Sequence, residues 1–126
     1  MKLTVTSMLL VAMILAVKLQ VAISQDSFNC GGSTLCSGPL ISQQQCDEAK
    51  RKIVATTRYF TGGSSQETGV CSGHCGLLVG GGSNCDLTGQ EMLDAFSELR
   101  IRECAKCGVK TYNDACQFKM DYVASC

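Results

Sequence analysis

The chain is poor in the residues that build large cores and in those that most enzymes need. It contains no tryptophan, one proline and one histidine, and aromatic residues make up only 6% of it. The single histidine, His74, belongs to no Ser–His–Asp grouping, and a Cys–His protease would leave an odd cysteine among ten. The glycine run 80–82 lacks the strand, lysine and helix context of a phosphate-binding loop. These absences favour a protein that is not an enzyme and that uses neither a cofactor nor a metal.

Long apolar runs are also absent, except near the N-terminus. Residues 8–17 form an apolar stretch after the positive start Met1-Lys2, and Lys18 ends it well short of the ~20 residues that a membrane span needs. Ala22 and Ser24 supply small residues at the positions that signal peptidase reads. We therefore predict a signal peptide over residues 1–24, a secreted, extracellular protein, and one domain over residues 25–126.

The mature chain has no excess of positive charge. The full sequence has 11 basic and 11 acidic residues, but Lys2 and Lys18 belong to the predicted signal peptide, which leaves a net charge of −2. A slightly acidic chain has no general attraction for nucleic acid or for anionic lipid. We accordingly expect no nucleic-acid partner and no stable membrane insertion.

Cysteine is abundant. Ten cysteines follow the predicted signal peptide, and this density in a small secreted domain indicates a disulfide framework. Two spacings have other readings, because Cys104-Ala-Lys-Cys107 has the spacing of a redox pair and Cys71-Ser-Gly-His-Cys75 that of half a zinc site. In an oxidised context both favour structural disulfides, since neighbouring cysteines can bond to different distant partners. The ten positions are Cys30, Cys36, Cys46, Cys71, Cys75, Cys85, Cys104, Cys107, Cys116 and Cys126.

The rest of the chain alternates between helical and strand-like segments. Residues 40–56 contain neither glycine nor proline and predict an amphipathic helix, with Pro39 suited to its first turn. The capping box Thr88-Gly-Gln-Glu91 predicts a second helix that continues to Glu103. Strands are predicted at residues 57–61, 76–79, 109–112 and 118–123, and turn-rich segments at 26–38, 70–75 and 80–83. This order predicts an α+β fold, a small disulfide-rich α/β sandwich with an antiparallel sheet and two helices on one face.

One basic cluster occurs near the end of the first predicted helix. Lys50-Arg51-Lys52 is followed closely by Arg58. The helix dipole favours cations at a helix C-terminus, so a solvated helix end explains the cluster. The alternative is a local contact surface for an acidic partner, formed by Lys50, Arg51, Lys52 and Arg58.

Four short segments spread over the mature chain carry a family resemblance. They are Phe28-Asn-Cys-Gly-Gly-Ser-Thr-Leu-Cys36, Asn84-Cys85, Cys104-Ala-Lys-Cys107-Gly and Asp121-Tyr-Val-Ala-Ser-Cys126. In these segments the chain resembles the Kp-four killer-toxin family, whose founding member is a secreted toxin encoded by a virus of a smut fungus. The resemblance implies an α/β sandwich with an antiparallel sheet, two helices and five disulfides.

The resemblance also implies a disulfide connectivity. It pairs Cys30 with Cys104 and Cys36 with Cys107, which ties the N-terminal arm to the end of the second helix. The other implied pairs are Cys75–Cys85 and Cys71–Cys126, and Cys46 and Cys116 remain as the last pair by elimination.

The function that the resemblance implies is that of a secreted, non-enzymatic killer toxin. Such a protein is a monomer that acts on other cells by inhibiting calcium channels and fungal growth, and its partner is a cell-surface channel or receptor. A lysine in a basic loop matters in the founding toxin, whereas the corresponding segment here, between Cys71 and Cys75, is only Ser-Gly-His. The alternative is a secreted effector or binding module on the same scaffold, without channel-blocking activity.

Overall fold

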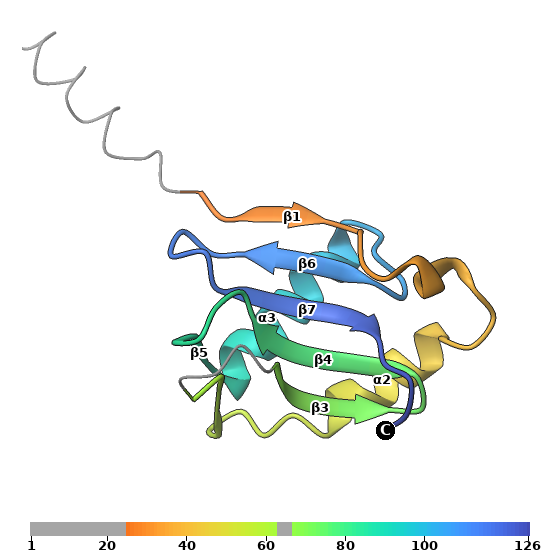
Figure 1. Ribbon diagram of the computed structural model, residues 1–126, viewed down its shortest axis with the longest axis horizontal. Helices are drawn as coiled ribbons and strands as arrows, with labels where there is room; N and C mark the ends of the chain where they lie inside the picture. Colours follow the sequence, from red (N-terminus) through yellow and green to blue (C-terminus); the bar gives the residue numbers. More distant parts are fainter. Residues whose placement is uncertain (1–24, 63–66) are drawn as a thin grey trace, which may run out of the picture.

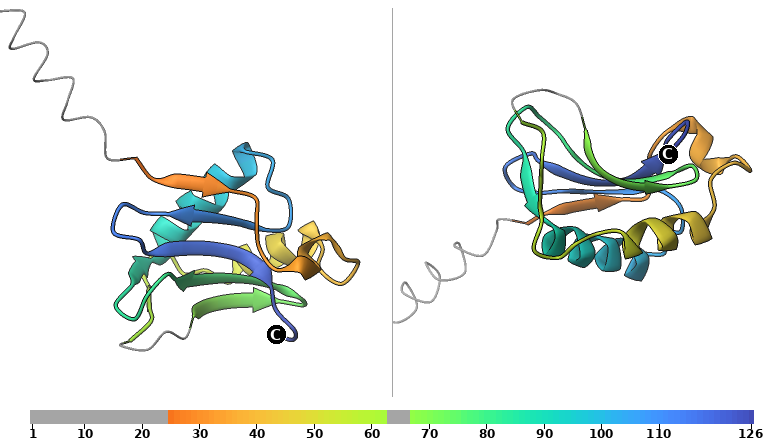
Figure 2. Two further views of the ribbon diagram at one scale, coloured as in Figure 1. Left: turned by 45° about the horizontal axis from the view of Figure 1, so that its top comes forward. Right: turned by 90° about the horizontal axis from the view of Figure 1, so that it is seen from below.

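The computed structural model describes residues 25–62 and 67–126. Over these residues a five-stranded antiparallel sheet carries both α-helices on one face (Figures 1 and 2), and a two-stranded sheet lies beside it. This is the predicted α+β class with disulfides. The predicted signal peptide lies outside the described residues. The elements are β1 (Ser27–Asn29), the 3₁₀ turn η2 (Thr34–Ser37), α2 (Gln43–Arg51), β2 (Arg58–Phe60), β3 (Thr68–Ser72), β4 (Cys75–Gly80), β5 (Asp86–Thr88), α3 (Gly89–Ile101), β6 (Gly108–Thr111) and β7 (Gln117–Tyr122).

Helix α2 is shorter than predicted at both ends. A capping box fixes its start, because the Gln45 N–H donates to Ser42 Oγ (3.2 Å) and the Ser42 N–H donates to Gln45 Oε1 (3.1 Å). The pattern Ser-x-x-Gln was the signal that the prediction of a start at residue 40 overlooked. Beyond Arg51 the Val54 N–H donates to the Tyr59 hydroxyl (3.2 Å). The helix therefore does not continue to residue 56.

Helix α3 begins at the predicted capping box and ends in a left-handed residue. The Glu91 N–H donates to Thr88 Oγ1 at 3.1 Å. At the other end Glu103 has φ 64°, and the Cys104 N–H bonds back to the Leu99 carbonyl at 3.0 Å. This closure satisfies the last carbonyls of the helix at a position where glycine is the usual residue.

The five-stranded sheet has the order β1-β6-β7-β4-β3, and all its pairings are antiparallel. The prediction of turns over residues 70–75 was wrong for most of this stretch, because β3 pairs with β4 from Thr68↔Val79 to Ser72↔Cys75. Only two residues connect the strands, and Gly73, with φ 55°, supplies the positive φ that so tight a hairpin requires. Strand β5 was also not predicted. It pairs with β2 in the smaller sheet.

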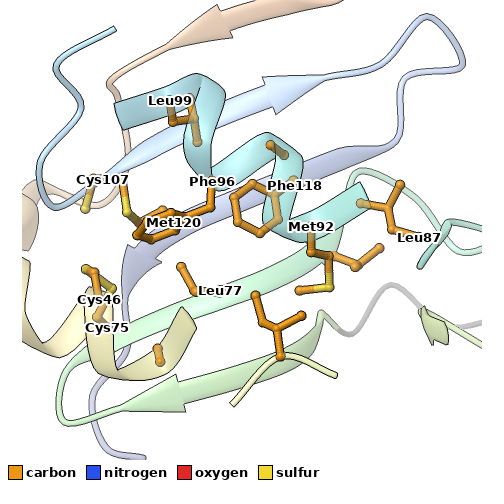
Figure 3. Close-up of a cluster of buried hydrophobic side chains, with 14 of the residues drawn as sticks. Cys46, Cys75, Leu77, Leu87, Met92, Phe96, Leu99, Cys107, Phe118 and Met120 are labelled. Carbon is orange, nitrogen blue, oxygen red and sulfur yellow. A yellow bond between two sulfur atoms is a disulfide. The ribbon is translucent and has the colours of Figure 1, made fainter. Parts of the chain in front are cut away.

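The hydrophobic core lies between the five-stranded sheet and the helices. Alternate residues of β4 and β7 point to this side and are fully buried. Figure 3 shows these side chains packed against one face of α3. Burying each large apolar side chain contributes roughly 1.5–3 kcal/mol, so this layer supplies most of the hydrophobic stabilisation. The sheet contributes Leu77, Val79, Phe118 and Met120, and α3 contributes Met92, Phe96 and Leu99.

Among the described residues, both α-helices lie on the other face, and the opposite face of these strands is the one that Figure 1 views. By strand alternation and register, one row across it consists of Gly69, Leu78 and Lys119. A second row consists of Cys71, Gly76 and Asp121. We call this surface the open face.

Strand β1 is fixed to the sheet edge by a cluster of charges and rings. The Arg102 guanidinium lies 3.6 Å and the Lys110 ammonium 5.4 Å from the centroid of the Phe28 ring. Lys110 is only 8% exposed and forms ion pairs with Glu98 (2.8 Å) and Asp26 (3.6 Å). This compensation allows a lysine to lie beneath the sheet, because a buried charge needs both partners and hydrogen bonds.

All ten cysteines form disulfides, and three pairs are those that the resemblance implies. These are Cys30–Cys104, Cys36–Cys107 and Cys71–Cys126. The first two join the N-terminal arm to the loop after α3. Five disulfides in so small a domain are typical of proteins that mature in an oxidising compartment.

The other two expected pairs are wrong. Cys75–Cys85 and Cys46–Cys116 are replaced by Cys46–Cys75 and Cys85–Cys116. Cys75 begins β4 on the side that faces α2, where Cys46 is buried, whereas Cys85 follows the other end of that strand, roughly 17–20 Å away. The register Gly80↔Gln117 brings Cys116 to that far end, next to Cys85.

Candidate functional site

The structure separates the four basic residues that the sequence grouped. Lys50 and Arg51 lie in the last turn of α2, Lys52 caps the helix, and Arg58 lies on β2. The Lys52 ammonium donates to the Cys71 carbonyl at 2.7 Å. Arg58 pairs with Asp86 on the neighbouring strand at 2.6 Å, and this hydrogen bond raises the pKa of the guanidinium. Two of the four cations are therefore engaged by the protein itself.

The other two cations border a groove between α2 and α3, which we call the interhelix groove. Its volume is about 460 Å³, and its walls are Asp47, Lys50, Arg51, Ile53 and Leu93. Ile53 and Leu93 provide an apolar surface, and the side chains from α2 are all charged. The groove is therefore amphipathic, with a charged wall on α2 and an apolar wall extending to α3.

A buried aromatic ring, Phe96, contacts one of the cations that line the groove, Lys50. Phe96 of α3 is 3% exposed, and the Lys50 ammonium lies 5.2 Å and the Arg100 guanidinium 4.6 Å from its ring centroid. A cation over an aromatic face is stabilised by roughly 0.5–2 kcal/mol, depending on its exposure. Both cations therefore contact the same ring.

The carboxylate at the groove compensates only one of these cations. Asp47 pairs with Arg100 at 2.8 Å. Two other nitrogens of Arg100, Nε and Nη2, are buried and have no hydrogen-bond partner among the described residues. Lys50 contacts the Phe96 ring, and exposed Arg51 has no ion pair within residues 25–62 and 67–126. The groove therefore carries a surplus of positive charge.

The turn between β3 and β4 lies in the segment Cys71–Cys75, where the resemblance led us to look for a basic loop. Gly73 and His74 form the tight turn between β3 and β4. The His74 ring stacks on Tyr122 with a centroid distance of 5.5 Å, and His74 Nδ1 lies 3.0 Å from the Val123 carbonyl oxygen. This segment presents a packed imidazole and no lysine or arginine.

The cysteine spacings that resemble redox and zinc motifs are divided between distant partners. Cys104 and Cys107 bond to Cys30 and Cys36, and together the two bridges line a second concavity of about 270 Å³. Asp121 Oδ1 lies 3.3 Å from Cys36 Sγ and accepts the Ser33 N–H at 2.9 Å. The sulfur atoms beside this carboxylate are bonded to each other, so they do not act as thiolate ligands in this oxidised form.

Most of the interhelix groove was not predicted. The sequence marked Lys50 and Arg51 by their charge, but it did not single out Asp47 or Phe96. The spacing of four residues between Asp47 and Arg51 and between Phe96 and Arg100 places each pair on one helix face. That spacing was the available signal, but bringing the two faces together requires the tertiary structure.

No helix in residues 25–62 and 67–126 combines the length and the apolar character that crossing a bilayer requires.

No curated protein matches the chain. A family model described as the meiotically up-regulated gene family, MU117, matches residues 28–126, which covers both helices and both sheets except for the first residue of β1. The chain therefore belongs to the meiotically up-regulated gene family.

Proposed function

We propose that this chain is a secreted, non-enzymatic, killer-toxin-like protein that acts as a monomer on other cells. Its effect is the inhibition of calcium channels and of fungal growth, and its partner is a channel or receptor at the cell surface.

The observation that carries this proposal is the pair of bridges Cys30–Cys104 and Cys36–Cys107. They connect two of the four segments in which the chain resembles the killer-toxin family, and they have the connectivity that this resemblance implies. A cross-linked arm of this kind suits a protein that must keep its shape outside the cell, where disulfides persist.

Non-enzymatic action is supported by the state of the nucleophile candidates. Every cysteine is bonded to another cysteine, so no thiolate is available for covalent catalysis. His74 Nδ1 is directed to a backbone carbonyl, and its ring is stacked on Tyr122. A protein of this kind acts through its surface.

A second candidate is a secreted effector or binding module without channel-blocking activity. The tight turn at Gly73 and His74 favours it, because the position of the toxin's cationic loop has no cation here. Under this alternative, the target is a receptor whose engagement leaves calcium currents unchanged.

Growth and calcium-influx assays on fungal cells test the proposal. The purified, fully oxidised protein is expected to slow growth and reduce calcium uptake, and the reduced and alkylated protein serves as the inactive control. Capture of a specific surface receptor by the oxidised protein, with unchanged calcium influx and growth, would replace the toxin proposal with the binding module.

A further inference from the structure

The interhelix groove has an electrostatic imbalance that its own residues do not correct. Lys50 and Arg100 both contact the Phe96 ring, and Asp47 pairs only with Arg100. Lys50 and Arg51 are adjacent in the chain, and neither forms an ion pair with another described residue, so a ligand that brings negative charge is attracted to them. The rest of the mature chain is slightly acidic, so this positive site contrasts with its surroundings.

The groove also offers apolar contact beside that charge. Ile53 and Leu93 line it together with the α2 cations. A bare inorganic anion would leave this apolar wall uncovered, whereas an aliphatic side chain would bury it at about 25 cal/mol per Å². The chemistry of the walls therefore selects a ligand with a carboxylate and an aliphatic group close together.

Given that the protein acts by contacting a partner on another cell, as proposed above, we propose that the interhelix groove binds an acidic peptide segment of that partner protein. In the bound segment a glutamate or aspartate pairs with Lys50 and Arg51, and a neighbouring leucine or isoleucine packs on Ile53 and Leu93.

Charge complementarity favours this occupant over a membrane surface. A bilayer presents a flat sheet of anions and attracts proteins through an extended basic patch. Here Lys52 and Arg58 are engaged elsewhere, and Asp47 stands inside the groove. The local positive charge is therefore confined to a narrow site with a carboxylate in it.

A titration of the oxidised, isotope-labelled protein followed by NMR tests the proposal. The probe is a synthetic peptide of alternating leucine and glutamate, and the control peptides replace glutamate by glutamine or leucine by serine. The acidic leucine peptide is expected to shift the amide signals of Asp47, Arg51, Ile53 and Leu93 in a saturable way. Each control peptide is expected to bind at least about fivefold more weakly.

Adjacent residues of the chain provide matched variants. Arg51→Glu and Lys52→Glu make the same change in charge, but only Arg51 lines the groove. We expect Arg51→Glu to weaken peptide binding about fivefold or more and Lys52→Glu to change it by less than about twofold. Equal effects of the two variants would show that only net charge matters and would overturn the proposal.

A parallel experiment with lipid vesicles tests whether the groove binds a membrane surface instead of a peptide. Co-sedimentation with vesicles that contain anionic phosphatidylserine is expected to show no binding at physiological salt. Arg51-dependent binding to them, with no response to the peptide, would assign the groove to a membrane instead. If the peptide binds but the cell assays show no effect, the proposed function is refuted and the groove assignment stands. If the cell effect survives Arg51→Glu, the groove assignment is refuted and the proposed function stands.

Discussion

The face of the sheet that carries the helices and the open face belong to the same strands but are built from different residues. On β4 and β7 the covered side presents Leu77 and Phe118, which are completely buried. The open side of these strands presents Gly76 and Asp121, which pair with each other across the two strands. One face is held by buried apolar area, and the other has little apolar area to bury.

On the open face, disulfides and polar contacts hold the chain in place of buried apolar side chains. Cys71 on the open face bonds to Cys126, which holds the chain end across it, and Val123 lies against Gly76. Asp121 receives the Ser33 N–H from the N-terminal arm at 2.9 Å. The comparison shows that a small domain can build a layer on one face of a sheet with helices and secure the other with short covalent straps.

The largest effect is expected from truncating the covered face. Phe118→Ala removes a fully buried ring and should lower the free energy of unfolding by about 3–5 kcal/mol. Leu78→Ala, on the next strand but on the open face, should cost about 1 kcal/mol or less. Denaturant unfolding of the oxidised proteins measures both, and similar losses would refute the difference between the faces.

Removing the strap on the open face should come next. The double variant Cys71→Ser with Cys126→Ser opens a loop with a sequence separation of 55 residues, and the loop-entropy model assigns about 4 kcal/mol to it as an upper value. We expect a loss of about 2–4 kcal/mol and faster hydrogen exchange of the Val123 amide, which bonds to the His74 carbonyl. Unchanged protection of that amide would show that the tail is held without the bridge.

A smaller effect is expected at the polar contact of the open face. Asp121→Ala removes the acceptor of the Ser33 N–H and should cost about 1–2 kcal/mol. Asp121→Asn keeps an acceptor oxygen and is the matched control, expected to lose less than half as much. Thermal unfolding with both disulfides of the arm intact distinguishes the two variants.

At high pH, the stability of the protein should fall in part because of Tyr112, which follows β6. Burial, with the nearby carboxylates Glu91 and Glu98 of α3, raises the pKa of Tyr112 above its ordinary value of 10.0. Above about pH 10 the unfolded chain releases a proton that the folded chain keeps, so this part of the stability is lost as pH rises. Tyr112→Phe should remove that part of the alkaline decline, as measured by denaturant unfolding between pH 9 and 11. An identical decline in both proteins would contradict the assignment.

The smallest expected effect is a gain in the free energy of unfolding at Glu103, between α3 and the cysteines that hold the N-terminal arm. Glu103 adopts φ 64° at the end of α3, where glycine avoids the strain of a side chain. We expect Glu103→Gly to stabilise the protein by about 0.5–1 kcal/mol, whereas Glu103→Ala should bring no comparable gain. Equal midpoints for the glycine and alanine variants would show that the backbone there is unstrained.

The sequence was most informative where the signal is local. The capping box Thr88–Glu91 placed the start of α3, and the strand predicted at residues 118–123 corresponds to β7, where buried Phe118 and Met120 alternate with partly exposed residues. The β3–β4 hairpin was not predicted, because its turn, Gly73-His74, is flanked by cysteines and glycines that are typical of loops. The five-stranded order likewise depends on non-local pairing, which no local pattern encodes.

The candidate site was only half predictable for a related reason. Charge drew attention to Lys50 and Arg51, but charge alone also included Lys52 and Arg58, which the fold engages with Cys71 and Asp86. The difference between a free and an engaged cation lies in partners 19 and 28 residues away along the chain. The same holds for Cys46 and Cys75, whose pairing follows from which side of β4 faces α2.

The disulfide connectivity also sets an order on how the chain matures during synthesis. Of the six cysteines that precede α3, only Cys46 and Cys75 form a native pair with each other. The other four bridges each need a partner from residues 104–126, so Cys71 must stay unbonded until residue 126 is delivered. Cys75 lies only four residues away and Cys85 has no native partner yet, so any early bond made by Cys71 must later be exchanged. The yield of folded protein should therefore depend on disulfide isomerisation after synthesis is complete.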